Sequence, residues 1–174
     1  MKFGRVFLVI CLMSLTSLSH ANPCYRSKGH LHKNGGGFVA DSAKVDETAF
    51  IDRAAQVCGN AQVKNSAKIL NAAIVDEQAI VSENAVISVM AKISGKSSIS
   101  GNAVVTGGAK VFGDAKVFEN AKVSGMAQVY QQASVSGLAS VTGSAKVFGQ
   151  AQVKGNSKIN KDTQVDGDRI INEK

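Results

Sequence analysis

The chain has 174 residues, which is enough for a single domain. Its formal net charge is +7, which is a mild excess for this length. No segment after the N-terminal region approaches the roughly 20 consecutive apolar residues of a membrane-spanning helix, so the composition excludes such a helix there.

The first 21 residues have the three-part layout of a secretory signal peptide. Lys2 and Arg5 start it, an apolar run follows, and Ser19 and Ala21 supply small residues at positions −3 and −1 of a cleavage site. The layout predicts a bacterial protein exported to the periplasm or the extracellular space, the alternative being an uncleaved N-terminal anchor. Without Lys2 and Arg5, 18 basic residues stand against 13 acidic ones, and the net charge is +5.

Residues 22–38 precede the repeat described below and are expected to cap one end of it. Two cysteines follow the predicted cleavage site, Cys24 and Cys58. In an oxidising compartment they are candidates for one disulfide, which would tie the N-terminal segment to the first part of the repeat. Two separate thiols are the alternative, because spacing alone does not establish the geometry of a disulfide.

From residue 39 to residue 171, a valine or isoleucine returns every six residues, at all 23 positions. The position two before it is Ala in 18 of 22 cases, and the exceptions are Ser97, Ser157, Thr163 and Arg169. A helix does not explain this period, because a step of six residues turns a helix by about 600° and spreads the valines around its surface. A strand explains it, since residues two apart face the same side and Val and Ile suit strands.

Three residues separate each valine from the next alanine, and they often include Gly-Asn, Gly-Gly or Gly-Asp. Such pairs accept the left-handed backbone angles of a corner, so each hexapeptide is predicted to be one short strand and one corner. Three hexapeptides would close a triangular coil of 18 residues. The sequence therefore predicts an all-β solenoid.

The segment "HKNGGGFVADSAKV" at residues 32–45, followed by "GNAQV" units, resembles the bacterial hexapeptide-repeat family in its loop-less form. The resemblance implies a single-stranded left-handed parallel β-helix, and the handedness rests on the resemblance alone. We expect about seven coils over residues 39–171, without large loop insertions, and a C-terminal tail at 172–174.

Many members of this family are acyltransferases in which a histidine acts as general base. Here His20 lies in the predicted signal peptide, and His30 and His32 precede the coils, so no catalytic residue of the family carries over. His30 and His32 are too few for a closed zinc site and are expected to be a solvated pair. We therefore expect no catalytic residue, no cofactor and no metal, with the acyltransferase as the alternative.

Residues 18 apart should stack on one face of such a coil. The rows that this spacing brings together are an aromatic one, Phe112, Tyr130 and Phe148, and beside it a polar one, Lys110, Gln128 and Lys146. Aromatic rings with polar donors suit the binding of a glycan chain. The alternative is that the aromatic residues cover the face, stack on one another, or arose by duplication of "AKVFG".

The middle of the chain is basic, with nine lysines against Asp114 and Glu119 between residues 84 and 161. Such a surface suits an anionic envelope polymer or a polysaccharide, and the alternative is a solvated lysine face. The sequence thus predicts an exported, non-enzymatic structural or binding module, with no specific nucleic-acid partner. Self-assembly, as a trimer or end to end, is a further alternative.

Overall fold

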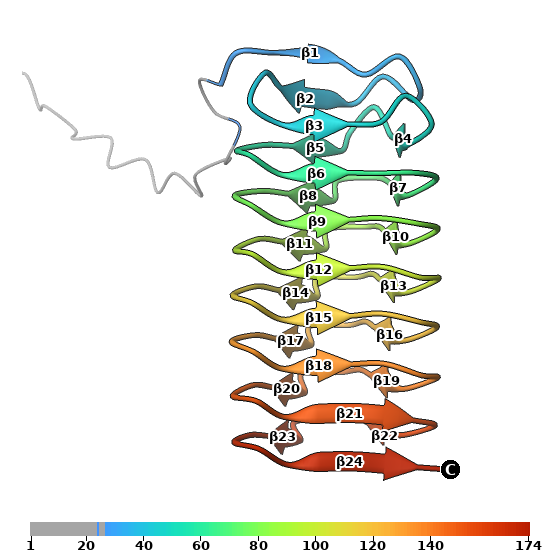
Figure 1. Cartoon of the computed structure of the whole chain (residues 1–174), viewed down its shortest axis with the longest axis vertical. Coiled ribbons are helices and arrows are strands. Elements are labelled where there is room, and N and C mark those ends of the chain that lie inside the picture. Colours follow the sequence, from blue (N-terminus) through green and yellow to red (C-terminus); the bar gives the residue numbers. More distant parts are fainter. Residues whose placement is uncertain (1–23, 25–26) are drawn as a thin grey trace, which may run out of the picture.

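The computed structural model of the chain describes residue 24 and residues 27–174. These residues form a rod of stacked coils whose 24 strands are collected into three parallel-sided sheets (Figure 1). Followed from β3 toward β24, the chain turns counterclockwise as it moves away from the N-terminal end, so the solenoid is left-handed (Figure 1). The predicted all-β, left-handed parallel β-helix is confirmed.

Each coil contributes one strand to each sheet. The eight-stranded sheet contains β3 (Lys44–Val45), β6 (Gln62–Val63), β9 (Ile80–Val81), β12 (Ser98–Ile99), β15 (Lys116–Val117), β18 (Ser134–Val135), β21 (Gln152–Gly155) and β24 (Ile170–Glu173). The seven-stranded sheet contains β4 (Phe50–Ile51), β7 (Lys68–Ile69), β10 (Val86–Ile87), β13 (Val104–Val105), β16 (Lys122–Val123), β19 (Ser140–Val141) and β22 (Lys158–Ile159). The nine-stranded sheet contains β1 (Gly29–Leu31), β2 (Phe38–Ala40), β5 (Gln56–Val57), β8 (Ile74–Val75), β11 (Lys92–Ile93), β14 (Lys110–Val111), β17 (Gln128–Val129), β20 (Lys146–Val147) and β23 (Gln164–Val165).

The strands pair in parallel with residues 18 positions apart, as Val111 with Val129 and Val129 with Val147. With one strand per coil, the eight-stranded sheet counts eight coils, within one turn of the expected number. The exact register follows from the constant repeat length, because every hexapeptide has one strand and one corner of the same size. Side chains that share a position in the repeat therefore stand in rows along the rod.

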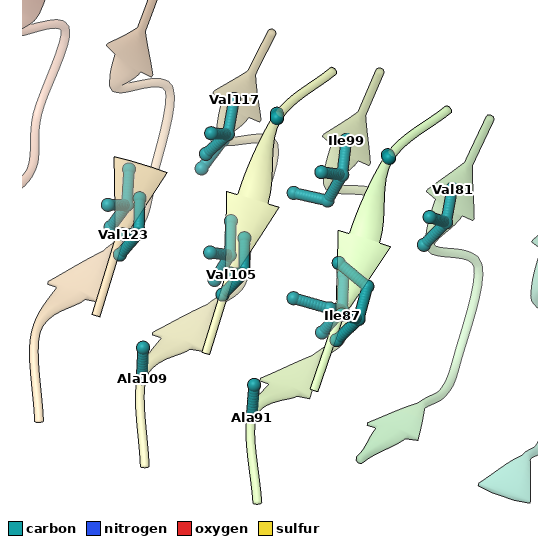
Figure 2. Packing of buried hydrophobic residues seen from close by; sticks show 14 of the residues in the cluster. Val81, Ile87, Ala91, Ile99, Val105, Ala109, Val117 and Val123 are labelled. Carbon is teal, nitrogen blue, oxygen red and sulfur yellow. The ribbon is translucent and has the colours of Figure 1, made fainter. Parts of the chain in front are cut away.

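The core is a continuous column of the two repeated small and aliphatic positions (Figure 2). From Ala61 to Val153 every inward valine, isoleucine and alanine is fully buried. Ser97 and Ser157 occupy alanine positions and are fully buried too, and their hydroxyls donate to the carbonyl oxygens of Ser94 and Lys154, 2.7 and 2.6 Å away. Because each buried hydroxyl is satisfied within its own corner, serine can replace alanine there.

The corners use the left-handed backbone conformation. From Gly59 to Gly167, every sixth residue has a positive φ, whether or not it is glycine. At several corners a side chain also reaches the next coil: Glu77 accepts the N–H of Gly95 at 2.7 Å, and Gln131 accepts that of Gly149 at 2.6 Å. The predicted left-handed corners are confirmed, and these bonds link successive coils outside the core.

The N-terminal segment folds over the first coil. Strand β1 pairs antiparallel with β2, and Cys24 forms a disulfide with Cys58 whose Cα atoms lie 5.4 Å apart. His32 is buried, with its Nε2 atom 3.1 Å from the carbonyl oxygen of Ala49. The expectation of a solvated histidine pair is therefore wrong for His32, because the turn after β1 folds its ring against the first coil.

The C-terminal end is formed by β24, which pairs with β21 on one side only. Arg169, the large residue at an alanine position, is exposed and forms an ion pair with Asp166 at 3.1 Å. None of the residues that the structure describes belongs to a helix that could cross a membrane. The predicted signal peptide lies outside the described residues.

Candidate ligand-binding face

The three predicted aromatic residues form a stacked row on the nine-stranded sheet. Phe112, Tyr130 and Phe148 directly follow β14, β17 and β20, so the 18-residue register places them one above another. The ring centroids of Phe112 and Tyr130 are 4.9 Å apart, and those of Tyr130 and Phe148 are 5.0 Å apart. The interplanar angles are 1° and 5°. We call these three residues the aromatic row.

Stacking decides which part of each ring a ligand can reach. Both faces of Tyr130 lie against neighbouring rings, and all three side chains are half-buried. A sugar ring therefore has no free face of Tyr130 to lie on. The row presents ring edges instead, and aromatic edges carry partial positive charge.

The polar row lies on the strands that precede these rings. Lys110 is the cross-strand partner of Gln128, and Gln128 is the partner of Lys146. The structure adds Lys92, which pairs directly with Lys110 on the neighbouring strand. Like charges placed opposite each other in a sheet destabilise it unless something neutralises them.

No carboxylate neutralises this lysine row in the described part of the chain. The ion pairs found there are His30–Asp41, Lys33–Glu47 and Arg169–Asp166, all of which lie elsewhere on the rod. The face therefore combines positively charged ammonium groups with positively polarised ring edges. This arrangement favours an anionic ligand over a neutral one.

The corner beyond the aromatic row is hollowed and lined by amides. A depression of about 250 Å³ is bordered by Gln131, Gln132, Gly149 and Gln150, at the left-hand edge of the rod in Figure 1. Each amide carries both hydrogen-bond donors and an acceptor. A polar chain lying on the aromatic row would find such groups at its side.

Two larger hollows lie on the eight-stranded sheet, and sequence reasoning did not identify them. One, of about 530 Å³, is lined by Asp114, Lys116, Phe118, Gln132, Ser134 and Gln152. The other, of about 600 Å³, is lined by Asn60, Gln62, Gln78, Ile80 and Lys96. Reading the 18-residue rows of this sheet, as was done for the other, would have shown its amides.

Groups suited to acid–base or metal chemistry do not gather among the described residues. No three side chains of His, Cys, Asp or Glu there come together in a way that could hold a metal ion. His30 is largely exposed, and its Nδ1 atom is 3.7 Å from Asp41 on the N-terminal segment. Neither histidine of the described chain lies near the aromatic row in the coil sequence.

Comparison with known proteins gives the fold and no more. No family model matches the sequence, and no curated protein matches it. Among solved structures, the chain is similar to UDP-N-acetylglucosamine acyltransferase from Campylobacter jejuni, with a TM-score of 0.51 and 15% sequence identity. The match covers 75% of this chain and 72% of that one.

The likeness is one of fold. It agrees with the parallel solenoid described above, and the resemblance to hexapeptide-repeat β-helices is confirmed at that level. At 15% identity it assigns no activity to this chain, because one fold supports many functions.

Proposed function

We propose that the protein is a non-enzymatic binding module that holds an extended anionic polysaccharide along its nine-stranded sheet. The observation that carries the proposal is the in-register pair Lys92 and Lys110, next to the aromatic row, without a carboxylate partner among the described residues. An acidic polymer would supply the missing negative charge.

The repeat suits a polymer better than a small molecule. Neighbouring strands of a sheet are about 4.8 Å apart, so each coil advances the rod by that distance. A chain lying parallel to the rod axis would meet Lys92, Lys110, Gln128 and Lys146 in turn, one side chain per coil. Several weak contacts to one linked ligand then add up to useful affinity.

An envelope or extracellular location fits this function. It is supported by the signal-peptide layout of the first 21 residues and by the Cys24–Cys58 disulfide, a bond that persists mainly in oxidising compartments. Acidic polysaccharides are present in the same compartments. The proposal therefore places the rod at the bacterial envelope or outside the cell.

Acyl transfer is the alternative that the structural neighbour's name brings forward. General-base catalysis needs a titratable group held within reach of the acceptor. His30 and His32 both lie on the N-terminal segment, one largely exposed and the other buried against Ala49. We favour binding because its residues are assembled on one face, whereas those of a transferase site are not assembled in the described chain.

The test is retention of the purified protein on polymers across a series of salt concentrations. We expect retention on immobilised polygalacturonate that weakens as salt screens the lysines, with less retention on peptidoglycan, cellulose and chitin. A variant with Phe112→Ser, Tyr130→Ser and Phe148→Ser, which repeats the residue of Ser94 in the same row, should be retained less.

The control is Phe50→Ser, which removes one aromatic side chain from the seven-stranded sheet and should leave retention unchanged. If the wild-type protein is not retained by any anionic polymer at low salt, the proposal is wrong. If the triple variant remains folded and binds as well as wild type, the aromatic row has no part in binding.

A further inference from the structure

The eight-stranded sheet carries a groove made of the two larger hollows. Its lining side chains come from six consecutive coils, and we call them together the amide groove: Asn60, Gln62, Gln78, Ile80, Lys96, Asp114, Lys116, Phe118, Gln132, Ser134 and Gln152. This sheet faces the viewer in Figure 1, around the corner from the aromatic row. At about 4.8 Å per coil, six coils extend over roughly 24 Å.

Amides dominate the polar lining of this groove. Five of its side chains are Asn or Gln, and Ser134 adds a hydroxyl. An amide group offers two N–H donors and a carbonyl acceptor, and a sugar hydroxyl is itself a donor and an acceptor. The groove therefore matches a ligand that carries many neighbouring hydroxyls.

Phe118 supplies a ring whose faces are not taken by other rings. Its neighbours 18 residues before and after are Ser100 and Ser136, and the stacked ring pairs of the described chain involve only the aromatic row. A pyranose presents C–H groups on its face, and these suit the negative face of an aromatic ring. Phe118 thus offers what Tyr130 cannot, a place for a sugar ring to lie flat.

The charges in the groove are mixed. Lys96 and Lys116 are positive, whereas Asp114 lies in the same hollow as Lys116 and would repel an acidic chain. The lysine row on the nine-stranded sheet has no such carboxylate partner. The two surfaces therefore differ in the charge of the chain that they suit.

From these features we propose that the amide groove is a second binding site, for a neutral β-linked glycan chain, with one sugar ring stacked on Phe118. The chain runs parallel to the rod axis, and successive coils supply amides to its hydroxyls. This site is independent of the anionic-polymer site, because the two share no residue.

The experiment is a titration of the full, ¹⁵N-labelled protein with cellohexaose and chitohexaose, followed by NMR of backbone and side-chain amides. We expect shifts at Gln132, Ser134 and Gln152, and none at Gln128. Phe118→Ser, which repeats the residues of the two neighbouring coils, should weaken binding at least tenfold. Phe148→Ser, on the other sheet, should leave the affinity for either hexasaccharide unchanged.

The proposal is overturned if neither hexasaccharide moves the groove amides, or if Phe118→Ser binds as tightly as wild type while remaining folded. A Gln132→Ala variant gives a second test that leaves the aromatic ring in place, and it should also weaken binding. Polygalacturonate binding is measured in parallel on the same variants. Loss of that binding alone would contradict the proposed anionic-polymer function, whereas loss of hexasaccharide binding alone would contradict the amide groove.

Discussion

At the scale of single residues, the corner positions divide into those that suit a left-handed backbone and one that does not. Glu77 and Glu83 have φ values of 60° and 61°, and their side chains bond to the next coil's backbone at 2.7 and 2.9 Å. Val89 has φ of 62°, and its branched side chain makes no such bond. A left-handed conformation costs an L-residue about 1–2 kcal/mol, and Val89 has no compensating contact of that kind.

Replacing Val89 by Asn should therefore stabilise the protein. Asn stands at the same corner one coil earlier, at Asn71 with φ of 55°, and it tolerates this conformation. We expect the free energy of unfolding to rise by about 1 kcal/mol, measured by urea denaturation. Val86→Asn, a few residues earlier in strand β10, is the control and should not stabilise. A lower midpoint for Val89→Asn would contradict this account of the corners.

The buried column makes the opposite prediction for a charged residue. Val117 is fully buried, so Val117→Asp would place an unpaired carboxylate in the core at a cost of several kcal/mol. We expect this variant to lose cooperative thermal unfolding as followed by circular dichroism. Lys116→Asp changes the adjacent, exposed residue and should melt close to wild type. Cooperative melting of Val117→Asp near the wild-type temperature would mean that this side chain is not in the core.

Many of these residue environments were predictable from the sequence. The burial of Val117 follows from its place in an unbroken period of six, and the left-handed corners follow from their Gly and Asn content. The burial of His32 was not predictable, because the N-terminal segment does not repeat and no period assigns its side chains to a face. Likewise, the contact of both faces of Tyr130 with other rings depends on side-chain orientation, which a spacing of 18 residues leaves undetermined.

At the scale of elements, the N-terminal segment is held by strand pairing and by one covalent bond. Strand β1 pairs with β2, and the Cys24–Cys58 disulfide joins residues 34 positions apart. Only β1 is antiparallel among the pairings of the nine-stranded sheet given for the described chain. The segment therefore covers the first coil without continuing the helix.

Removing the disulfide should destabilise this end. For a loop of this length the chain-entropy model predicts a loss of about 3–4 kcal/mol in the free energy of unfolding. We expect that loss for the variant Cys24→Ala with Cys58→Ala, measured by urea denaturation. Wild type treated with a thiol reductant should unfold at a similarly reduced midpoint. An unchanged midpoint in both samples would show that the bond contributes nothing to stability.

At the scale of the whole molecule, the repeat separates folding from the arrangement of the surface. The core needs only the period of six, because every hexapeptide supplies the same valine and alanine, whereas the rows need the period of 18. The fold was therefore predictable from the sequence. The hollows of the amide groove were not, since they depend on how side chains of neighbouring coils fill the surface.

Deleting residues 119–124 should make this separation visible. The deletion keeps the period of six and hence the core, but it moves Phe112 out of line with Tyr130. We expect cooperative melting together with loss of polygalacturonate binding. Deleting residues 61–78, one complete coil, should keep both the melting and the binding. Equal binding by the two deletions would show that the rows are not needed.

The proposed anionic-polymer site is tested most directly by comparing two lysine variants of equal charge. One carries Lys92→Gln, Lys110→Gln and Lys146→Gln on the nine-stranded sheet, and the other carries Lys68→Gln, Lys122→Gln and Lys158→Gln on the seven-stranded sheet. Their affinity for polygalacturonate is measured at low salt by isothermal titration. We predict a loss of at least tenfold for the first variant and little change for the second. Equal affinities of the two variants would mean that attraction to net charge explains the binding and that the nine-stranded sheet holds no site.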